Sequence, residues 1–343
     1  MILLATGVRP RWSVLLIVVT VGLWGCDKPR ALGEPRQILV AAPQGLWDAL
    51  EEDIKNALEP RTFTVRDERV FDVAHVDPIE PGWADLRIMR QILVIGPPEN
   101  PAVAAAIEAY DSEIPPAPGV FQVRNLWARE QLVTVAVLPA GGDPESLRPL
   151  LQPLGQTLLN QFEQYARTRM FVTGPDEELR DSLSRNAGFT LTLPRVYRAE
   201  ELEPGVFQFR NDQPDPSQLI RNITVASRPS DEAQMSAESA AQWRAELAER
   251  LTQPPQETQA GAEGHSLEIN GRPALQIDGI WSNPPNQWPA AGPFITRLVE
   301  CPDRTFLVDA WLYAPGTAKY EYMFQLNTII DSFECAPGGA GAA

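Results

Sequence analysis

Residues 266–281 read Ser-Leu-Glu-Ile-Asn-Gly-Arg-Pro-Ala-Leu-Gln-Ile-Asp-Gly-Ile-Trp, and they decide the fold of the second half of the chain. Asn270-Gly271 separates two strand-like segments, and an Asn-Gly pair in that position is the strongest short-range signal for a hairpin turn. Strands joined by so tight a turn run antiparallel. We therefore expect a mainly antiparallel sheet built outward from this hairpin.

Further strand-like segments lie on both sides of the hairpin, with few helical patterns among them. Apolar residues recur at helical spacing only in 240–251 and 320–330, which predicts two helices. Residues 253–264 contain prolines and glycines but no periodic apolar residue, so we expect a mobile loop there. The expected strands are residues 189–193, 206–209, 220–226, 266–269, 274–281, 294–299 and 306–313.

In the first half of the chain, strand and helix patterns alternate. Asn100 followed by Pro101 marks the start of one helix, since Asn is a favoured N-cap and Pro a favoured first helical residue. Another helix starts at Asp143-Pro144 and is expected to be disturbed by Pro149 and Pro153. The expected strands are residues 38–42, 71–76, 92–95, 121–127 and 132–137, and the expected helices are 46–58, 101–110 and 144–165.

We summarise this half as βαβαββα, the alternation typical of an α/β sheet layered by helices. The predicted fold class is thus α+β / α/β, with an N-terminal sheet-and-helix domain followed by a mainly antiparallel sandwich. The predicted divisions are a signal peptide (1–25), a tether (26–36), the N-terminal α/β domain (37–172), a helical connector (173–188), the C-terminal sheet domain (189–335) and a disordered tail (336–343).

The first 25 residues fit a targeting segment better than part of a fold. Arg9 and Arg11 precede an apolar stretch over 12–23. That stretch is too short to span a bilayer, which needs about 20 residues. A short apolar stretch behind positive charge is the pattern of a signal peptide.

The stretch Leu23-Trp24-Gly25-Cys26 resembles the bacterial lipobox, although Trp24 is bulky for its position. The resemblance implies that the sulfur of Cys26 receives diacylglycerol and that Cys26 becomes the first residue of the mature protein. We therefore expect a lipoprotein of the bacterial cell envelope, anchored to the membrane by lipid, with its soluble part in the periplasm. The sequence leaves the choice between inner and outer membrane open.

The charge balance argues against two classes of partner. The chain has 29 Lys and Arg against 45 Asp and Glu, a formal net charge of −16. An acidic surface repels phosphate backbones, so we expect no nucleic-acid partner. The same charge argues against attraction to anionic lipid. We expect the lipid alone to hold the protein and the body to stand away from the bilayer.

Several short motifs along the chain carry a family resemblance. They are residues 38–47, Asn125-Leu126-Trp127-Ala128, Leu191-Thr192-Leu193-Pro194, Asn270-Gly271-Arg272, Gly279-Ile280-Trp281, Gly292-Pro293-Phe294 and Tyr313-Ala314-Pro315. Together they resemble the uncharacterised lipoprotein family called domain of unknown function 4837, over nearly the whole mature chain. That family implies no activity. The cysteine pair and the Ala/Gly tail of this chain depart from it.

The second half separately resembles the PsbP-like α/β/α sandwich. The resemblance rests on the Leu193-Pro194 opening, the central hairpin, and a closing helix that leads into Asp331-Ser332-Phe333. It implies a binding or assembly module.

Catalytic and metal-binding motifs are absent from the sequence. Its two histidines, His75 and His265, lie in no metal-ligand spacing, and no nucleophile elbow, P-loop or His-Glu-x-x-His occurs. We interpret His75 as a structural residue of a strand and His265 as a solvated loop residue. We expect no cofactor and no metal.

Some carboxylates invite a glycosidase or calcium-site interpretation. Asp212 with Asp215, and Glu200 with Glu201 and Glu203, lie in polar segments with prolines or glycines nearby. They lack the register of a calcium loop. Solvated loop charge is the interpretation we favour.

One loop is richer in aromatic and amide side chains than folding requires. We select Trp281, Asn283, Asn286, Gln287 and Trp288 as a ligand- or partner-binding set, because rigid aromatics beside amides often build binding sites. The simpler alternative is that both indoles cover the sandwich edge. We expect a non-enzymatic module that binds an envelope protein or a glycan. The alternatives are a glycan or cell-wall hydrolase using loop carboxylates, and a small-molecule carrier.

Cys301 and Cys335 are expected to form a disulfide. The strand that leaves Cys301 is followed by a helix that returns across the sheet, so Cys335 should arrive near the same turn. Thiols that meet in an oxidising periplasm pair. The alternative is two unpaired small residues.

Overall fold

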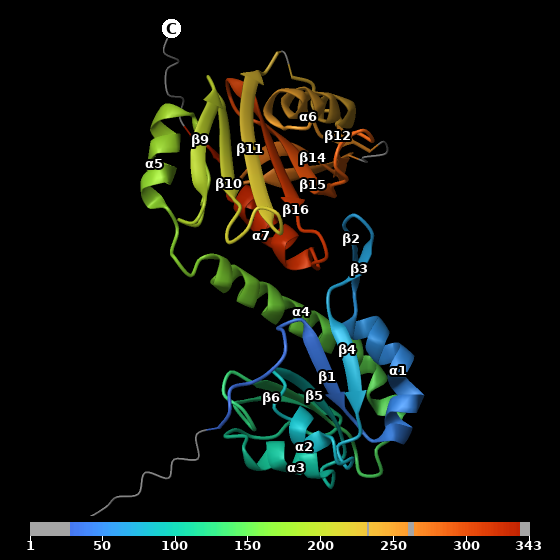
Figure 1. Ribbon diagram of the computed structural model, residues 1–343. Helices are drawn as coiled ribbons and strands as arrows, with labels where there is room; N and C mark the ends of the chain where they lie inside the picture. Colours follow the sequence, from blue (N-terminus) through green and yellow to red (C-terminus); the bar gives the residue numbers. More distant parts are fainter. Residues whose placement is uncertain (1–27, 232, 260–263, 337–343) are drawn as a thin grey trace, which may run out of the picture.

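The computed structural model describes residues 28–231, 233–259 and 264–336, which form two halves joined through a long helix (Figure 1). The sheet of the first half has the strand order β4-β1-β5-β7-β6. Its strands run parallel except for the edge strand β6. Their bounds are β1 (Gln37–Ala41), β4 (Asp72–Val76), β5 (Gln91–Gly96), β6 (Gly119–Arg124) and β7 (Leu132–Val137).

Helices cover both faces of this sheet. Alternate residues of a strand point to opposite sides, so one strand contributes side chains to two cores. Ile38 and Val40 of β1 pack in a core with α1 and α4, whereas Leu39 and Ala41 pack in a core with α3. The helices are α1 (Gln44–Leu58), α2 (Trp83–Leu86), α3 (Pro101–Glu108) and, after a 3₁₀ turn at Pro144–Ser146, α4 (Arg148–Met170).

The predicted fold class is confirmed, while the detailed order βαβαββα was incomplete. It counts one strand between its first two helices, whereas the expected segments 71–76 and 92–95 both form strands, β4 and β5. The chain adds α2 between β4 and β5, and a small hairpin formed by β2 (Arg61–Phe63) and β3 (Asp67–Arg69) after α1. These elements are too short to show a repeating pattern of apolar residues in the sequence. The expected disturbance of the third helix was also wrong, because Pro153 lies inside an α4 that continues through it.

The segment 28–36, expected as a tether, is docked on the first half of the protein. The backbone N–H of Ala31 donates to the carbonyl of Arg129 at 2.9 Å, and that of Arg129 donates to the carbonyl of Pro29 at 2.8 Å. The prolines and glycine of the segment exclude regular structure but not this pairing of extended backbone. The predicted signal peptide and Cys26 lie outside the described residues, as does most of the predicted tail.

The second half contains an antiparallel sheet of strand order β12-β14-β15-β16-β11-β10-β9, with β13 paired to β14. The predicted hairpin is present. Asn270 and Gly271 have φ angles of 47° and 78°, as the two central residues of a type I′ turn require. The strands are β9 (Arg198–Glu203), β10 (Val206–Asn211), β11 (Ile220–Pro229), β12 (Glu257–Thr258), β13 (Gly264–Ile269), β14 (Arg272–Ser282), β15 (Ala291–Glu300) and β16 (Arg304–Tyr313).

Three segments of this half differ from expectation. β9 lies at the sheet edge, is mostly charged and has no buried residue, so it gave no alternating signal. β12 lies inside the segment expected as a mobile loop and pairs with β14. The strand expected over 189–193 is reduced to β8 (Phe189–Thr190), which pairs with β17 (Glu334–Cys335).

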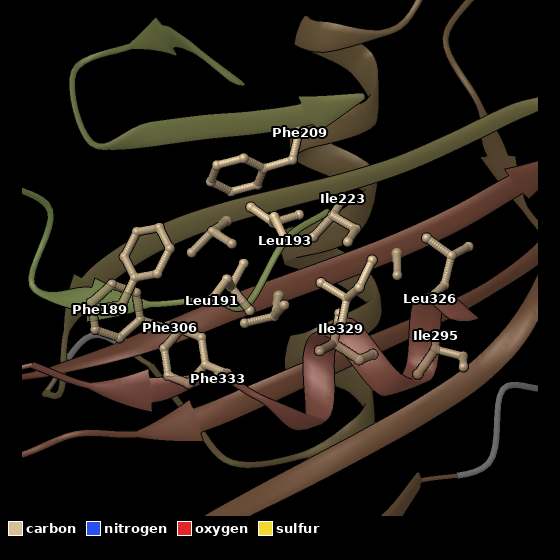
Figure 2. Packing of buried hydrophobic residues seen from close by; sticks show 14 of the residues in the cluster. Phe189, Leu191, Leu193, Phe209, Ile223, Ile295, Phe306, Leu326, Ile329 and Phe333 are labelled. Carbon is tan, nitrogen blue, oxygen red and sulfur yellow. The ribbon is translucent and has the colours of Figure 1, made fainter. Parts of the chain in front are cut away.

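Helices sandwich this sheet, with α6 (Ala237–Leu251) on one face and α7 (Tyr320–Asp331) on the other. Figure 2 shows the core beneath α7, where Leu326 and Ile329 of the helix meet Ile295 of the sheet. The expected connector forms α5 (Glu177–Asn186), and its Leu183 joins this same core. α5 therefore packs as part of the second half.

A disulfide joins Cys301 to Cys335, whose Cα atoms are 5.9 Å apart. Cys301 lies in the turn between β15 and β16, and Cys335 lies in β17, which follows α7. The bond ties the end of the chain's last paired strand to the central sheet.

Candidate functional site

Trp281, selected from the sequence as part of a binding loop, is a core residue. Its side chain is 3% exposed and packs against Trp311, with ring centroids 5.4 Å apart. Its Nε1–H donates to the carbonyl of Leu312 at 3.2 Å. Gly292 makes this contact possible, because a Cβ there would lie 1.8 Å from that carbonyl oxygen and 2.7 Å from Nε1. We therefore remove Trp281 from the candidate site.

The other selected residues do lie on the surface, in the loop between β14 and β15 that we call the aromatic loop (residues 283–288). Trp288 is 53% exposed, and its indole lies edge-on to Tyr313 with centroids 5.8 Å apart. Asn283 is partly buried, and its Nδ2 donates to the carbonyl of Trp288 at 3.0 Å. Asn286 and Gln287 are exposed. The loop thus holds one large aromatic side chain and two amides toward solvent.

A second surface feature, which the sequence analysis missed, is a groove of about 1060 Å³ that we call the arginine groove. It lies where β5 and β7 begin and β6 ends. Four arginines line it with a single acid: Arg30, Arg90, Arg124, Arg129 and Glu130. Hydrogen bonds from Arg30 hold the pKa of the Glu130 carboxyl below its usual value. Basic groups outnumber acids here although the whole chain carries −16.

A buried ion pair connects the two halves. Glu68 of β3 and Lys319, just before α7, are 8% and 9% exposed. Lys319 donates to the Glu68 carboxylate from Nζ at 3.0 Å and from its backbone N–H at 2.8 Å. No spacing in the sequence links residues so far apart.

A cavity of about 440 Å³ lies beside this contact, between the β2–β3 hairpin, α4, α7 and β14–β15. Tyr320 donates from its hydroxyl to Glu163 at 2.6 Å across the junction of α7 and α4. Burial, and then the neighbouring Glu163 carboxylate, raise the pKa of Tyr320 well above its usual value. Asp278, the other carboxylate of the cavity, accepts from the side chain of Gln276 at 3.0 Å.

The histidines occupy ordinary structural positions. His75 lies on β4, and its Nε2 is 2.8 Å from the carbonyl oxygen of Ala42 while its ring stacks on Trp47 at 4.5 Å. His265 lies on β13 rather than in a loop, and its Nδ1 is 3.9 Å from Asp278.

The carboxylates expected as solvated loop charge differ from one another in their environment. Asp212 is buried and accepts from Arg198 at 2.7 Å and from Arg210 at 3.0 Å. Asp215 does lie in an exposed turn, where hydrogen bonds from Ser217 lower its pKa. Glu200, Glu201 and Glu203 belong to the edge strand β9.

Two features are absent from the described residues. Within 28–231, 233–259 and 264–336, no three or more His, Cys, Asp or Glu side chains are grouped so as to hold a metal ion. In the same part of the chain, no helix combines the length and the apolar character that crossing a membrane requires.

Comparison with known sequences gives a family match for part of the chain. Residues 176–332 match the family model described as domain of unknown function 4837. The predicted resemblance to that family is confirmed over this stretch, which runs from the N-cap of α5 to the end of α7. The match does not include residues 38–47 or 125–128, which were also expected to carry it. No curated protein matches the chain.

Several solved structures are similar at low level. A protein of Bacteroides thetaiotaomicron shares 11% identity with a TM-score of 0.29, over 46% of this chain and 48% of that one, so the chain spans about half of its length. The cyanobacterial PsbP of Synechocystis shares 10% with a TM-score of 0.31, over 43% and 87%. LpqN of Mycobacterium tuberculosis, described as involved in cell envelope biogenesis, shares 17% with a TM-score of 0.29, over 43% and 83%. Similarity at this level transfers no function.

Proposed function

We propose that this chain is a bacterial envelope lipoprotein, anchored by lipid on Cys26, whose folded part is a non-enzymatic module that binds an envelope protein. The proposed location and lipid anchor are supported by the signal-like segment 1–25 and the lipobox-like Leu23-Trp24-Gly25-Cys26. Lys28 already contacts the folded part of the protein, because its Nζ donates to the carbonyl of Asn125 at 2.7 Å. Cleavage before Cys26 would therefore leave the fold intact.

The binding role rests on one observation, the exposed indole of Trp288. Its loop is held in one shape by the Asn283 side chain and by the backbone N–H of Gln287, which donates to the carbonyl of Pro284 at 2.9 Å. An aromatic side chain that is fixed before binding loses little entropy on contact. Such residues are enriched among those that dominate binding energy.

The described residues give the hydrolase alternative no specific support. Both oxygens of Asp212 already accept from arginines. In the cavity of about 440 Å³ beside the Glu68–Lys319 pair, Glu163 accepts from Tyr320 and Asp278 accepts from Gln276. In a glycosidase, two carboxylates flank the bond to be cleaved, whereas each of these carboxylates already accepts a hydrogen bond from a neighbouring side chain.

The test is a comparison of Trp288→Ala with Val172→Ala in crosslinked pull-downs from intact envelopes. Val172 is a matched control, because it is an exposed apolar residue outside the aromatic loop. A hot-spot aromatic contributes at least about 2 kcal/mol, which corresponds to roughly a thirtyfold loss of affinity. We expect one captured protein to be lost with Trp288→Ala and retained with Val172→Ala, at unchanged melting temperature.

Equal capture by the two variants would contradict the role of the loop. A glycan recovered in place of a protein would contradict the choice of partner. A large fall in melting temperature for Trp288→Ala would show that the indole serves folding.

A further inference from the structure

The described chain begins on one particular face of the molecule. Lys28 contacts Asn125, a residue that lines the arginine groove, and Arg30 lines the groove itself. In Figure 1 this start lies at the end of the molecule opposite α6 and β12. The position of residue 28 therefore decides which surface is near anything attached just before it.

Cys26 is only two residues before Lys28. Two fully extended residues span at most about 7 Å. A lipid on Cys26 would enter the bilayer within that reach of the docked segment. The body cannot stand away from the membrane on a tether, because residues 28–36 are already paired with the first half.

The surface brought to the membrane in this way is basic. Arg30, Arg124 and Arg129 are exposed in the groove, and Lys28 lies beside it. Arg30 and Arg90 share the carboxylate of Glu130, at 3.1 and 3.5 Å, so the lining keeps a surplus of positive charge. The opposite wall of the groove is formed by α4, with neutral side chains that include Gln161, Gln164 and Tyr165. The net charge of −16 is therefore unevenly distributed, which the total alone could not reveal.

An apolar side chain accompanies these charges. Leu32 is 55% exposed, and its backbone N–H donates to the carbonyl of Ile88 at 3.0 Å, which fixes it on the docked segment. Basic residues beside an exposed leucine suit the boundary between headgroups and acyl chains.

We propose that the arginine groove faces the anchoring membrane and binds the phosphates of anionic phospholipid headgroups. This inference rests on the proposed lipid at Cys26 for its geometry. The groove takes headgroups as planar guanidinium groups take phosphates, by paired hydrogen bonds and opposite charge. Docked in this way, the protein directs β12, α6 and the rest of that end away from the bilayer (Figure 1), toward partners in the periplasm.

The experiment uses the mature chain, residues 26–343, coupled through the thiol of Cys26 to a maleimide phospholipid in vesicles. This coupling fixes the anchor without relying on lipidation by the cell. The photo-crosslinking amino acid p-benzoylphenylalanine replaces Gln164, in the groove, or Asn186, an exposed amide at the end of α5. Lipid adducts are then counted by mass spectrometry, in phosphatidylcholine vesicles with and without phosphatidylglycerol.

We expect adducts at position 164 to exceed those at 186 severalfold, and only with phosphatidylglycerol present. An arginine near an anionic surface contributes about fivefold to association. Arg30→Gln with Arg124→Gln should therefore reduce the adducts by roughly 25-fold. The matched control removes the same charge from exposed Arg185 and Arg272 and should change little.

Equal adduct yields at the two positions would overturn the proposed orientation. A yield at 164 that ignores phosphatidylglycerol, or that falls equally in the two double variants, would overturn the role of the arginines. Failure of the proposed function has a separate signature, an unmodified Cys26 in protein taken from the envelope, and it would leave the result on the coupled chain unchanged.

Discussion

Replacing Glu68 by Gln should weaken the connection between the two halves. The carboxylate of Glu68 accepts from both the side chain and the backbone N–H of Lys319, at 3.0 and 2.8 Å. Glutamine retains the shape of the side chain but leaves the ammonium of Lys319 without its counter-charge. Neither residue is more than 9% exposed, so water cannot readily replace the lost partner.

The size of the effect follows from this burial. Removing one partner of a buried pair costs about 3–5 kcal/mol of folding free energy. We expect the lower end of that range, because Nζ of Lys319 also donates to the carbonyl of Thr317 at 3.1 Å and keeps that contact. Asp67→Asn is the matched control on the same hairpin. Its ion pair with Arg61 is exposed, and such pairs contribute less than about 1 kcal/mol.

The assay is urea unfolding followed by circular dichroism, with both variants compared to the wild-type protein. Two halves can unfold in separate transitions, so each transition is fitted by itself. A second variant, Glu68→Gln with Lys319→Met, removes the unpaired ammonium, while the glutamine side-chain oxygen can still accept from the backbone N–H at position 319. It should recover much of the loss. Equal stabilities of Glu68→Gln and Asp67→Asn would refute the reasoning, as would a double variant no better than the single one.

Gly292→Ala should lower stability by about 1–3 kcal/mol, because the new Cβ would lie 1.8 Å from a backbone carbonyl oxygen of β16. Gly45→Ala should not lower stability in the same thermal melts, because a Cβ there would have nothing within 4 Å and alanine favours the helix α1. Reducing the Cys301–Cys335 bond, of sequence separation 34, should cost about 3–4 kcal/mol through the freed unfolded chain; free thiols at these positions in protein prepared without reductant would contradict the pairing. Burial raises the pKa of Tyr197 from 10.0 to about 12, so its contribution is fully present below pH 10 and is lost as pH rises toward 12. Tyr197→Phe should remove part of this alkaline loss in urea titrations, and an unchanged pH profile would contradict the assignment.

Local features of the chain were predictable because their causes are local. The Asn270-Gly271 turn needs only two residues that tolerate positive φ, and the N-cap of α3 needs only Asn100, whose side chain accepts from the N–H groups of Ala102 and Val103. Helices α1, α6 and α7 were likewise found from apolar spacing.

The candidate site was predictable only in part. Trp281 and Trp288 look alike in the sequence, but only Trp281 has the Leu312 carbonyl within reach, and that contact depends on Gly292. Tertiary packing, rather than composition, separates the buried indole from the exposed one. No sequence pattern near either tryptophan indicates this difference in burial.

Features that join distant parts of the chain could not be predicted from the sequence. The arginine groove combines residues from 30 to 129, which form no basic cluster along the chain. The partners Glu68 and Lys319 are 251 positions apart. A polar edge strand such as β9 buries no regular face, so it also gave no periodic signal.

The mass of the N-terminal peptide of the protein purified from bacterial envelopes tests the central claim most directly. A lipid-anchored envelope protein predicts a peptide that begins at Cys26 and carries diacylglycerol on the cysteine sulfur. Cys26→Ser should abolish that species and release the chain from the membrane fraction, or leave it uncleaved, because stable anchoring needs two acyl chains. An unmodified Cys26, or a mature chain that begins at another residue, would contradict the account.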